Sequence, residues 1–319
     1  MNSESTIILD KKLIKLCPNE THDKKTISYS QYSKYIKCPK SWELRYIHKH
    51  YSTKESVDLV FGQAMHTTIQ KWLHVLYSVS VKKANEMDLS SILLTNMKSE
   101  YSARMEKSPD HFSSSEQLAS YYSDGVSILN YLKKKRTLYF TTKKFKLAAI
   151  EYPVQLKIHP DFDILLNGFL DLIFIDETDN SYLIIDIKTS ARGWNDYKKK
   201  DTVTTDQILV YKKFLCSLLG VDINKINVTY LILKRKLNED SLWPQKRVQE
   251  FSPSNGKLSL SRVEKQFKQF IEECFNKDGS YNTERKYPAF SGIKKMNCLH
   301  CPYNTQEDLC PSSNRIENV

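Results

Sequence analysis

The stretch GFLDLIFIDETDNSYLIIDIK (168–188) decides the fold. Two apolar runs, 164–175 and 181–189, flank the short polar turn DETDN, a pattern that is typical of a β-hairpin. If the turn is centred between Thr178 and Asp179, Asp171 lies directly opposite Asp186 on the neighbouring strand. Side chains in that relation have Cβ atoms about 4.5–5.5 Å apart. The hairpin therefore predicts two adjacent carboxylates within apolar strands.

Two buried carboxylates at this separation repel each other, unless one is protonated or a cation lies between them. A divalent ion that prefers oxygen ligands, such as Mg²⁺, removes the conflict. Lys188 shares the face of Asp186 because the side-chain period of a strand is two. Glu151, the one acid in the apolar run 147–157, adds a third carboxylate. The pattern predicts a metal site with an adjacent ammonium; the alternative is a simple Asp186–Lys188 ion pair on a solvated strand.

The rest of the chain divides into a helical first half and a strand-rich second half. Helices are predicted over 28–46, 56–78, 89–106 and 115–135. After these helices we expect a strand over 147–157, the hairpin, and a helix over about 204–219 that ends at Gly220. The last predicted elements are strands over 226–235 and 246–252 and a helix over 259–275. Strand, helix, strand is a βαβ unit, so part of the sheet is parallel. We expect an α/β protein: a mixed sheet flanked by helices.

Composition narrows the class of function. There are 48 Lys and Arg against 37 Asp and Glu, a net charge of +11, and the basic residues gather in the runs 133–136, 143–146, 198–200 and 234–236. A charge of this size favours a polyanionic partner or an anionic surface, and the four runs leave nucleic acid and a merely solvated surface as equal alternatives. The 8 glycines are too scattered for a phosphate-binding loop or a dinucleotide fingerprint. No apolar run suggests a membrane span or a signal peptide, so a cytoplasmic protein is expected.

Five short motifs in this order resemble the PD-(D/E)XK nuclease superfamily, in particular its RecB-like exonuclease branch with CRISPR-associated and AddB-type iron–sulfur nucleases. FGQAMH (61–66) is similar to a Gly-x-x-x-His motif, GFLD (168–171) to Gly-x-x-Asp, and DQILVY (206–211) to Gln-x-x-x-Tyr. The remaining matches are Asp171 itself and Asp186-x-Lys188. The resemblance covers roughly residues 27–311 and implies a restriction-endonuclease-like core.

The resemblance also implies roles for individual residues. His66, Asp171 and Asp186 would hold Mg²⁺ or Mn²⁺, with the Ile187 carbonyl as a further ligand. Glu151 would act through a second metal or through water, and Lys188 would orient the attacking water. Gln207 and Tyr211 would guide the DNA strand. Without the resemblance, His66 is more readily a packed histidine, and Gln207 with Tyr211 an ordinary helix-packing pair.

The C-terminal segment CLHCPYNTQEDLC predicts a metal-binding centre, because Cys298 and Cys301 form a CxxC pair with Cys310 nearby. The resemblance implies that Cys38 supplies a fourth ligand to a [4Fe–4S] cluster. The last spacer is longer than is usual for this branch, so zinc, with His300 or Cys38 as fourth ligand, remains an alternative, as does the absence of a metal. Cys17, Cys216 and Cys274 fit buried positions.

The sequence thus predicts four regions: an N-terminal extension (1–26), a helical portion with His66 and Cys38 (27–140), a nuclease core (141–290) and a Cys-rich segment (291–319). The expected function is that of a metal-dependent DNA exonuclease in recombination, repair or phage DNA processing. DNA is the expected partner, possible protein partners belong to recombination or replication, and no membrane is involved. The alternatives are a DNA-binding or scaffolding module without cleavage and a cysteine-metal interaction protein.

Overall fold

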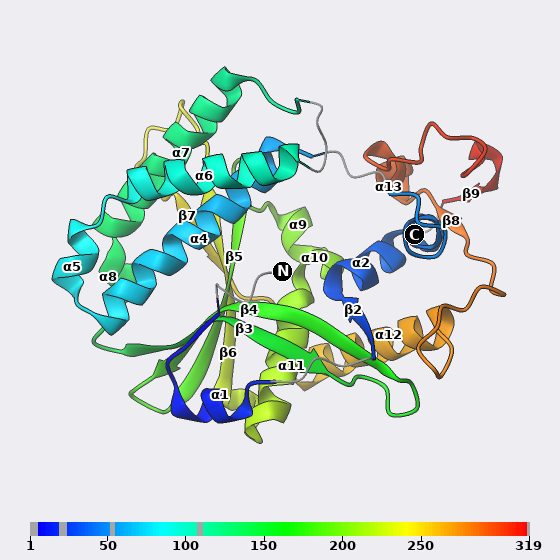
Figure 1. Ribbon diagram of the computed structural model, residues 1–319, viewed down its shortest axis with the longest axis horizontal. Helices are drawn as coiled ribbons and strands as arrows, with labels where there is room; N and C mark the ends of the chain where they lie inside the picture. The colour runs from blue at the N-terminus through cyan, green and yellow to red at the C-terminus, as the bar shows by residue number, and fades with distance from the viewer. Residues whose placement is uncertain (1–5, 19–23, 52–54, 107–110, 318–319) are drawn as a thin grey trace.

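The computed structural model describes residues 6–18, 24–51, 55–106 and 111–317. Its centre is a seven-stranded mixed sheet in the order β1-β3-β4-β5-β6-β7, with β2 beside β4 (Figure 1). The β2–β4 and β5–β6 pairs are parallel and the other pairs are antiparallel, which confirms the predicted mixed sheet. The strands are β1 (Ile7–Ile8), β2 (Lys25–Ser28), β3 (Phe145–Leu156), β4 (Ile164–Asp176), β5 (Ser181–Ser190), β6 (Ile226–Lys234) and β7 (Val248–Phe251).

Helices cover both faces of this sheet (Figure 1). On one side lie α4 (Val57–Ser78), α5 (Val81–Glu86), α6 (Leu89–Met105), α7 (Ser115–Lys134) and α8 (Arg136–Tyr139). On the other lie α1 (Lys11–Leu16), α2 (Tyr29–Lys37), α3 (Pro39–Tyr46), α11 (Gln207–Leu219) and α12 (Lys257–Cys274). Two short helices, α9 (Asp196–Lys200) and α10 (Thr202–Thr205), connect β5 to α11. The C-terminal segment contributes β8 (Ala289–Phe290), α13 (Met296–Leu299) and β9 (Arg315–Ile316).

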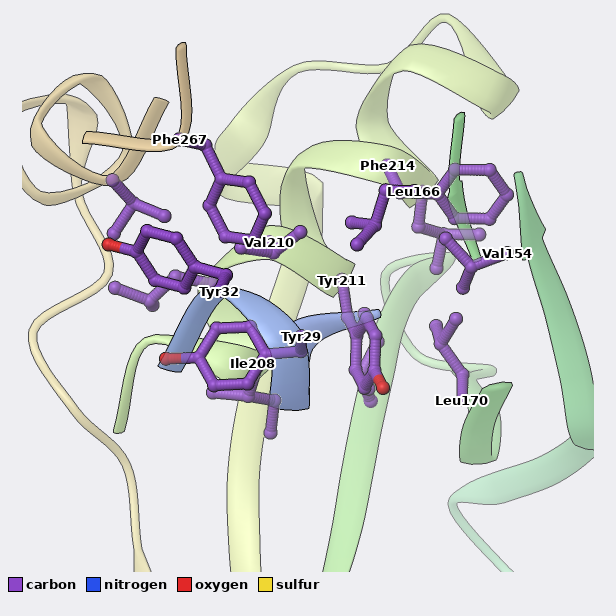
Figure 2. Packing of buried hydrophobic residues seen from close by; sticks show 14 of the residues in the cluster. Tyr29, Tyr32, Val154, Leu166, Leu170, Ile208, Val210, Tyr211, Phe214 and Phe267 are labelled. Carbon is purple, nitrogen blue, oxygen red and sulfur yellow. The ribbon is translucent and has the colours of Figure 1, made fainter. Parts of the chain in front are cut away.

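Each face of the sheet has its own hydrophobic core. Figure 2 shows the core on the α11 side, where aromatic rings from α2 and α12 meet. Tyr32 stacks on Phe267 with ring centroids 3.8 Å apart. On the α4 side, Trp72 and Phe140 are fully enclosed beside the strands. These two cores fix α4 and α11 on opposite faces of β4 and β5.

The predicted hairpin register is confirmed. Leu172 pairs with Ile185, and every pair from there to the turn keeps the expected alignment. Regular pairing ends at Leu172, one residue before Asp171 and Asp186 would face each other. Instead, the Ile187 N–H donates to the Asp171 carboxylate over 2.8 Å. A side chain therefore takes the place of a ladder hydrogen bond where β4 and β5 separate.

The predicted elements recur with small differences at their ends. The helix predicted over 28–46 is two helices, because Pro39 cannot donate the next backbone hydrogen bond and Cys38 adopts an extended conformation before it. Gly220 has φ 63° and ends α11 in the left-handed conformation, as predicted. The short strands β1, β8 and β9 were not predicted, because two residues carry no periodicity. In the part of the chain that the structure describes, no helix could span a bilayer.

Candidate active site

Three carboxylates form a row across neighbouring strands. The β3–β4 register pairs Ile150 with Leu172 and Tyr152 with Leu170, which places Glu151 opposite Asp171. Asp186 follows on β5 at the end of the hairpin pairing. Glu151 has φ +48°, a left-handed conformation that non-glycine residues rarely adopt. Such backbone strain is common at functional sites, where the surrounding structure maintains it.

The alternation of faces along β4 also breaks at this row. Leu170 packs into the core on the α11 side, whereas Leu172 packs into the core on the α4 side. In a regular strand, residues two apart share a face. On β5, Ile185 and Ile187 both face α4, so alternation places Asp186 toward α11. Asp171 therefore lies at the junction between the two faces.

One face of α4 runs along the row of acids. His66 Nδ1 lies 3.5 Å from the Asp171 carboxylate. One turn further, Gln70 Nε2 donates to the Glu151 carboxylate over 2.6 Å. Residues four apart share a helix face, which explains why the two contacts fall on successive strands. Gln70 was missed by the sequence analysis, although its i+4 spacing from His66 was a usable signal.

The two motif glycines are points of close approach. A Cβ on Gly62 would lie 3.4 Å from Thr189 Oγ1, so α4 passes close to β5 there. A Cβ on Gly168 would lie 3.1 Å from the Tyr211 hydroxyl, which is tighter than most real contacts. The absence of a side chain at Gly168 thus makes room for Tyr211 beneath β4.

His66, Glu151 and Asp171 form a group with the geometry of a metal site, since one ligand atom from each lies within 4.8 Å of the others. Burial, and next the charge of Asp186, raises the pKa of Asp171 to about 8. Burial followed by Asp171 raises the pKa of Glu151. Burial followed by Lys188 lowers the pKa of His66, which favours the neutral imidazole that binds metals. Asp171 and Glu151 both have raised pKa values, because their carboxylates are partly removed from water and their negative charges are close together. A divalent cation between them would compensate these charges, so the group fits a site for such an ion.

Asp186 is not in this group. Its carboxylate, in a residue only 2% exposed, pairs with Lys188 Nζ at 2.7 Å. Ile187 lies between the two sites: its N–H binds Asp171, and its backbone also hydrogen-bonds to His66. The structure thus brings the predicted ligands His66 and Asp171 together and adds Glu151 to them. The side chain of the third predicted ligand, Asp186, faces Lys188 instead.

Lys188 is held between an acid and an amide. Its Nζ lies 3.1 Å from Gln207 Oε1, and Gln207 Nε2 donates to the Tyr211 hydroxyl over 2.9 Å. Burial alone lowers the pKa of Lys188, but Asp186 and Asp171 outweigh burial and raise it. Tyr211 is only 5% exposed, so packing holds its ring in place, and its hydroxyl gives the Gln207 amide a fixed hydrogen-bond partner. The structure therefore joins the predicted residues Asp186, Lys188, Gln207 and Tyr211 in one chain of contacts.

The start of α11 is fixed by a residue far along the chain. Arg262 on α12 binds the buried Asp206 carboxylate through two hydrogen bonds of 2.6 and 2.7 Å. Asp206 directly precedes Gln207. The Tyr230 hydroxyl also accepts the Ile208 N–H over 3.2 Å. No sequence pattern indicated Arg262, because its pairing depends on how α12 packs on α11.

Cys38, Cys298, Cys301 and Cys310 line one pocket between α3 and the C-terminal segment. Burial chiefly raises the pKa of the Cys38 and Cys298 thiols. Within the described chain, no three of these sulfurs lie within 4.8 Å of one another. A tetrahedral zinc with Zn–S bonds of about 2.3 Å would need sulfurs roughly 3.8 Å apart. Four thiols around one pocket fit a shared metal centre.

Comparison with known proteins places the chain in a class of nucleases. The model of the PD-(D/E)XK nuclease superfamily matches residues 26–310, and the chain belongs to this superfamily. A comparison with curated proteins finds no match. Among solved structures, a candidate exonuclease from Eubacterium rectale is similar, with 10% identity and a TM-score of 0.46; the match covers 92% of this chain and 90% of that one.

Proposed function

We propose that the protein is a metal-dependent deoxyribonuclease of the RecB-like branch and acts as an exonuclease. The observation that carries this proposal is the row of Glu151, Asp171 and Asp186 between His66 on one side and Lys188 on the other. A partly buried cluster of acids beside one imidazole and one ammonium has the chemistry for phosphodiester hydrolysis. The net charge of +11 supports DNA as substrate.

His66, Glu151 and Asp171 would hold Mg²⁺ or Mn²⁺. Asp186 and the Ile187 carbonyl, which follow each other on β5, are candidate further ligands. When bound, such an ion would polarise the phosphate and lower the pKa of a water molecule. Gln70 keeps Glu151 in place by its hydrogen bond, whichever role the acid has.

Lys188 would stabilise the charge that develops on the scissile phosphate and orient the attacking water. Its ammonium is fixed by Asp186 and Gln207, so little reorganisation is needed when substrate binds. Tyr211 in turn fixes the Gln207 amide. We propose that Gln207 and Tyr211 act by orienting Lys188 and by guiding the strand toward it.

The four pocket cysteines would hold a [4Fe–4S] cluster, with zinc as the alternative metal. Either centre would link the region after α2 to the C-terminal segment and stabilise the fold without taking part in hydrolysis. His300 is exposed and does not line the pocket, which favours Cys38 as the fourth ligand. By analogy with the superfamily, the process is recombination, repair or phage DNA processing, with recombination or replication proteins as partners.

The decisive experiment is incubation with end-labelled linear DNA and with closed circular DNA, each with Mg²⁺, with Mn²⁺ and with chelator. Cleavage confined to linear DNA, dependent on metal and lost on chelation, is expected. Cleavage of the circle would replace the exonuclease assignment with an endonuclease. Binding without cleavage under every metal condition would favour a DNA-binding module that has lost activity.

A further inference from the structure

An aromatic side chain that the fold does not use lies on α9, directly after β5. The Tyr197 ring is 74% exposed. It belongs to the sequence Asp196-Tyr197-Lys198-Lys199-Lys200, in which Lys198 and Lys200 are also exposed. Large aromatic rings are normally buried because their apolar area is costly to expose. An exposed ring among ammonium groups has the composition of a nucleic-acid contact.

Two buried aromatic rings connect this surface to the candidate active site. Lys188 Nζ lies 6.0 Å from the centre of the Tyr230 ring. The Tyr230 ring lies 4.9 Å from that of Trp194, and Lys198 Nζ lies 5.3 Å from the Trp194 ring. Trp194 and Tyr230 are 4% and 0% exposed, so they hold their positions by packing. The Lys198 ammonium is thus linked to the candidate catalytic lysine through two buried rings.

The surface of α9 is positive beside the Tyr197 ring. The acid of this helix is paired within it, since Lys199 Nζ lies 3.4 Å from the Asp196 carboxylate. Lys198 and Lys200 are exposed, so the charge that α9 presents to solvent suits a phosphate backbone.

We propose, building on the nuclease function above, that α9 binds an unpaired DNA strand next to the scissile phosphate. One base stacks on the exposed face of Tyr197, and Lys198 and Lys200 bind the neighbouring phosphates. A ring that projects from a short helix can stack only on a base whose face is free, and a paired base inside a duplex offers none. The preferred substrate is therefore single-stranded at this point.

A second exposed aromatic serves as a matched control. Trp243 is 80% exposed on the segment between β6 and β7, next to Leu242, which is 95% exposed. The direct neighbours of Trp243 are Leu242 and Pro244, whereas Tyr197 is followed directly by three lysines, so no ammonium group is next to the Trp243 ring in the sequence. We expect Trp243 to make no contribution to strand binding.

The test measures binding of fluorescent oligothymidylate and of a blunt duplex to Asp186→Asn protein, which is expected to bind without cleaving. Adding Tyr197→Ala should raise the Kd for the single strand about tenfold, as the loss of one stacked base does. Tyr197→Phe should restore it, because stacking needs the ring and not the hydroxyl. Lys198→Gln should reduce the magnitude of the salt slope by about 1. Trp243→Ala should change neither binding constant.

Equal binding of single strands by Tyr197→Ala and by the parent would overturn the proposal, as would equal weakening of single-strand and duplex binding. Quenching of a 2-aminopurine base near the bound end should be lost in Tyr197→Ala and kept in Trp243→Ala. The assignment as a nuclease is tested separately by cleavage in protein with Asp186 intact. If the protein with Asp186 intact cleaves DNA but Tyr197→Ala binds single strands as tightly as the parent, only the proposed binding surface is rejected. If the protein with Asp186 intact does not cleave DNA, the nuclease function is rejected.

Discussion

The Gln70 side-chain amide lies 2.6 Å from the Glu151 carboxylate, joining the middle of α4 to a residue with left-handed backbone in β3. The contact is accompanied by a second one, in which Thr6 Oγ1 donates to the Glu151 carbonyl over 3.1 Å. Glu151 is thus held through both its side chain and its backbone. An acid restrained in this way keeps a fixed position relative to Asp171 before any ion or substrate arrives.

Replacing Gln70 by Ala should therefore lower kcat/KM about tenfold or more, since a hydrogen bond to a charged group contributes about 1.5–3 kcal/mol. The physical reason is the freed Glu151 side chain, not a loss of the acid itself. Steady-state cleavage of linear DNA measures the effect. Gln63→Ala, an exposed position on the same helix, is the control and should retain full activity. Equal activity of the two variants would remove Gln70 from the site.

Asp186→Ala and Lys188→Ala should each reduce cleavage at least about 10²-fold, the size of one lost electrostatic contribution to the transition state. Asp186 is buried and Lys188 is partly exposed, and the two groups pair with each other at 2.7 Å. The matched control is Lys144→Ala, which breaks the Lys144–Asp176 pair at the other end of β4. That variant should cleave normally. Full activity of both site variants would refute the assignment of this pair.

Gly168→Ala should lower activity several-fold without unfolding the protein. The new methyl group would lie 3.1 Å from the Tyr211 hydroxyl, which is already engaged by Gln207. Moving the hydroxyl would release the Gln207 amide that faces Lys188. Gly256→Ala is the control, because a Cβ there meets nothing within 4 Å and the backbone is extended. A Gly168→Ala enzyme as active as Gly256→Ala would show that Tyr211 is not needed to orient Gln207.

Binding of DNA should weaken steeply with salt. If about five Lys or Arg residues contact phosphates, log K should fall against log[salt] with a slope near −4. The reason is the release of counterions from the DNA when the basic surface binds. Fluorescence anisotropy at several salt concentrations gives the slope. A flat response would mean that the basic runs are only solvated surface.

Protein purified without oxygen should be brown, with broad absorption near 400 nm, if the cysteine pocket holds an iron–sulfur cluster. Cys38→Ser should lose the colour and lower the melting temperature, whereas Cys17→Ser, outside the pocket, should keep both. Colourless protein with stoichiometric zinc would replace the metal but keep the centre. Colourless, metal-free protein of unchanged stability would reject the centre altogether.

Much of the fold could be predicted because apolar periodicity and turn residues act locally. The β4–β5 register followed from one short turn, and the structure confirms it from Leu172 to the turn. The end of that pairing at Asp171 could not be predicted, since there the Asp171 carboxylate accepts the Ile187 N–H in place of a backbone carbonyl, and β4 changes the face on which its side chains pack. The sequence had no local sign of such a change of face.

In the candidate site, too, the local contacts could be predicted from the sequence and the long-range contacts could not. His66, Gln207 and Tyr211 lie at helical spacings that a motif can describe, and each contacts a neighbour of the expected kind. The Arg262–Asp206 pair joins residues 56 positions apart, and only the packing of α12 on α11 brings them together. Contacts of this kind arise from tertiary structure, and a single sequence contains no pattern that reveals them.

The contacts around Cys38 have a consequence for synthesis of the chain. Its sulfur accepts the Phe290 N–H over 3.3 Å, and the two residues are 252 positions apart. At about 5–20 residues per second, roughly 13–50 s separate the translation of these partners. During that interval the thiol of Cys38 is exposed to other thiols and to free metal ions. The yield of correctly assembled protein should therefore depend on how well the cell protects this one cysteine while the ribosome completes the chain.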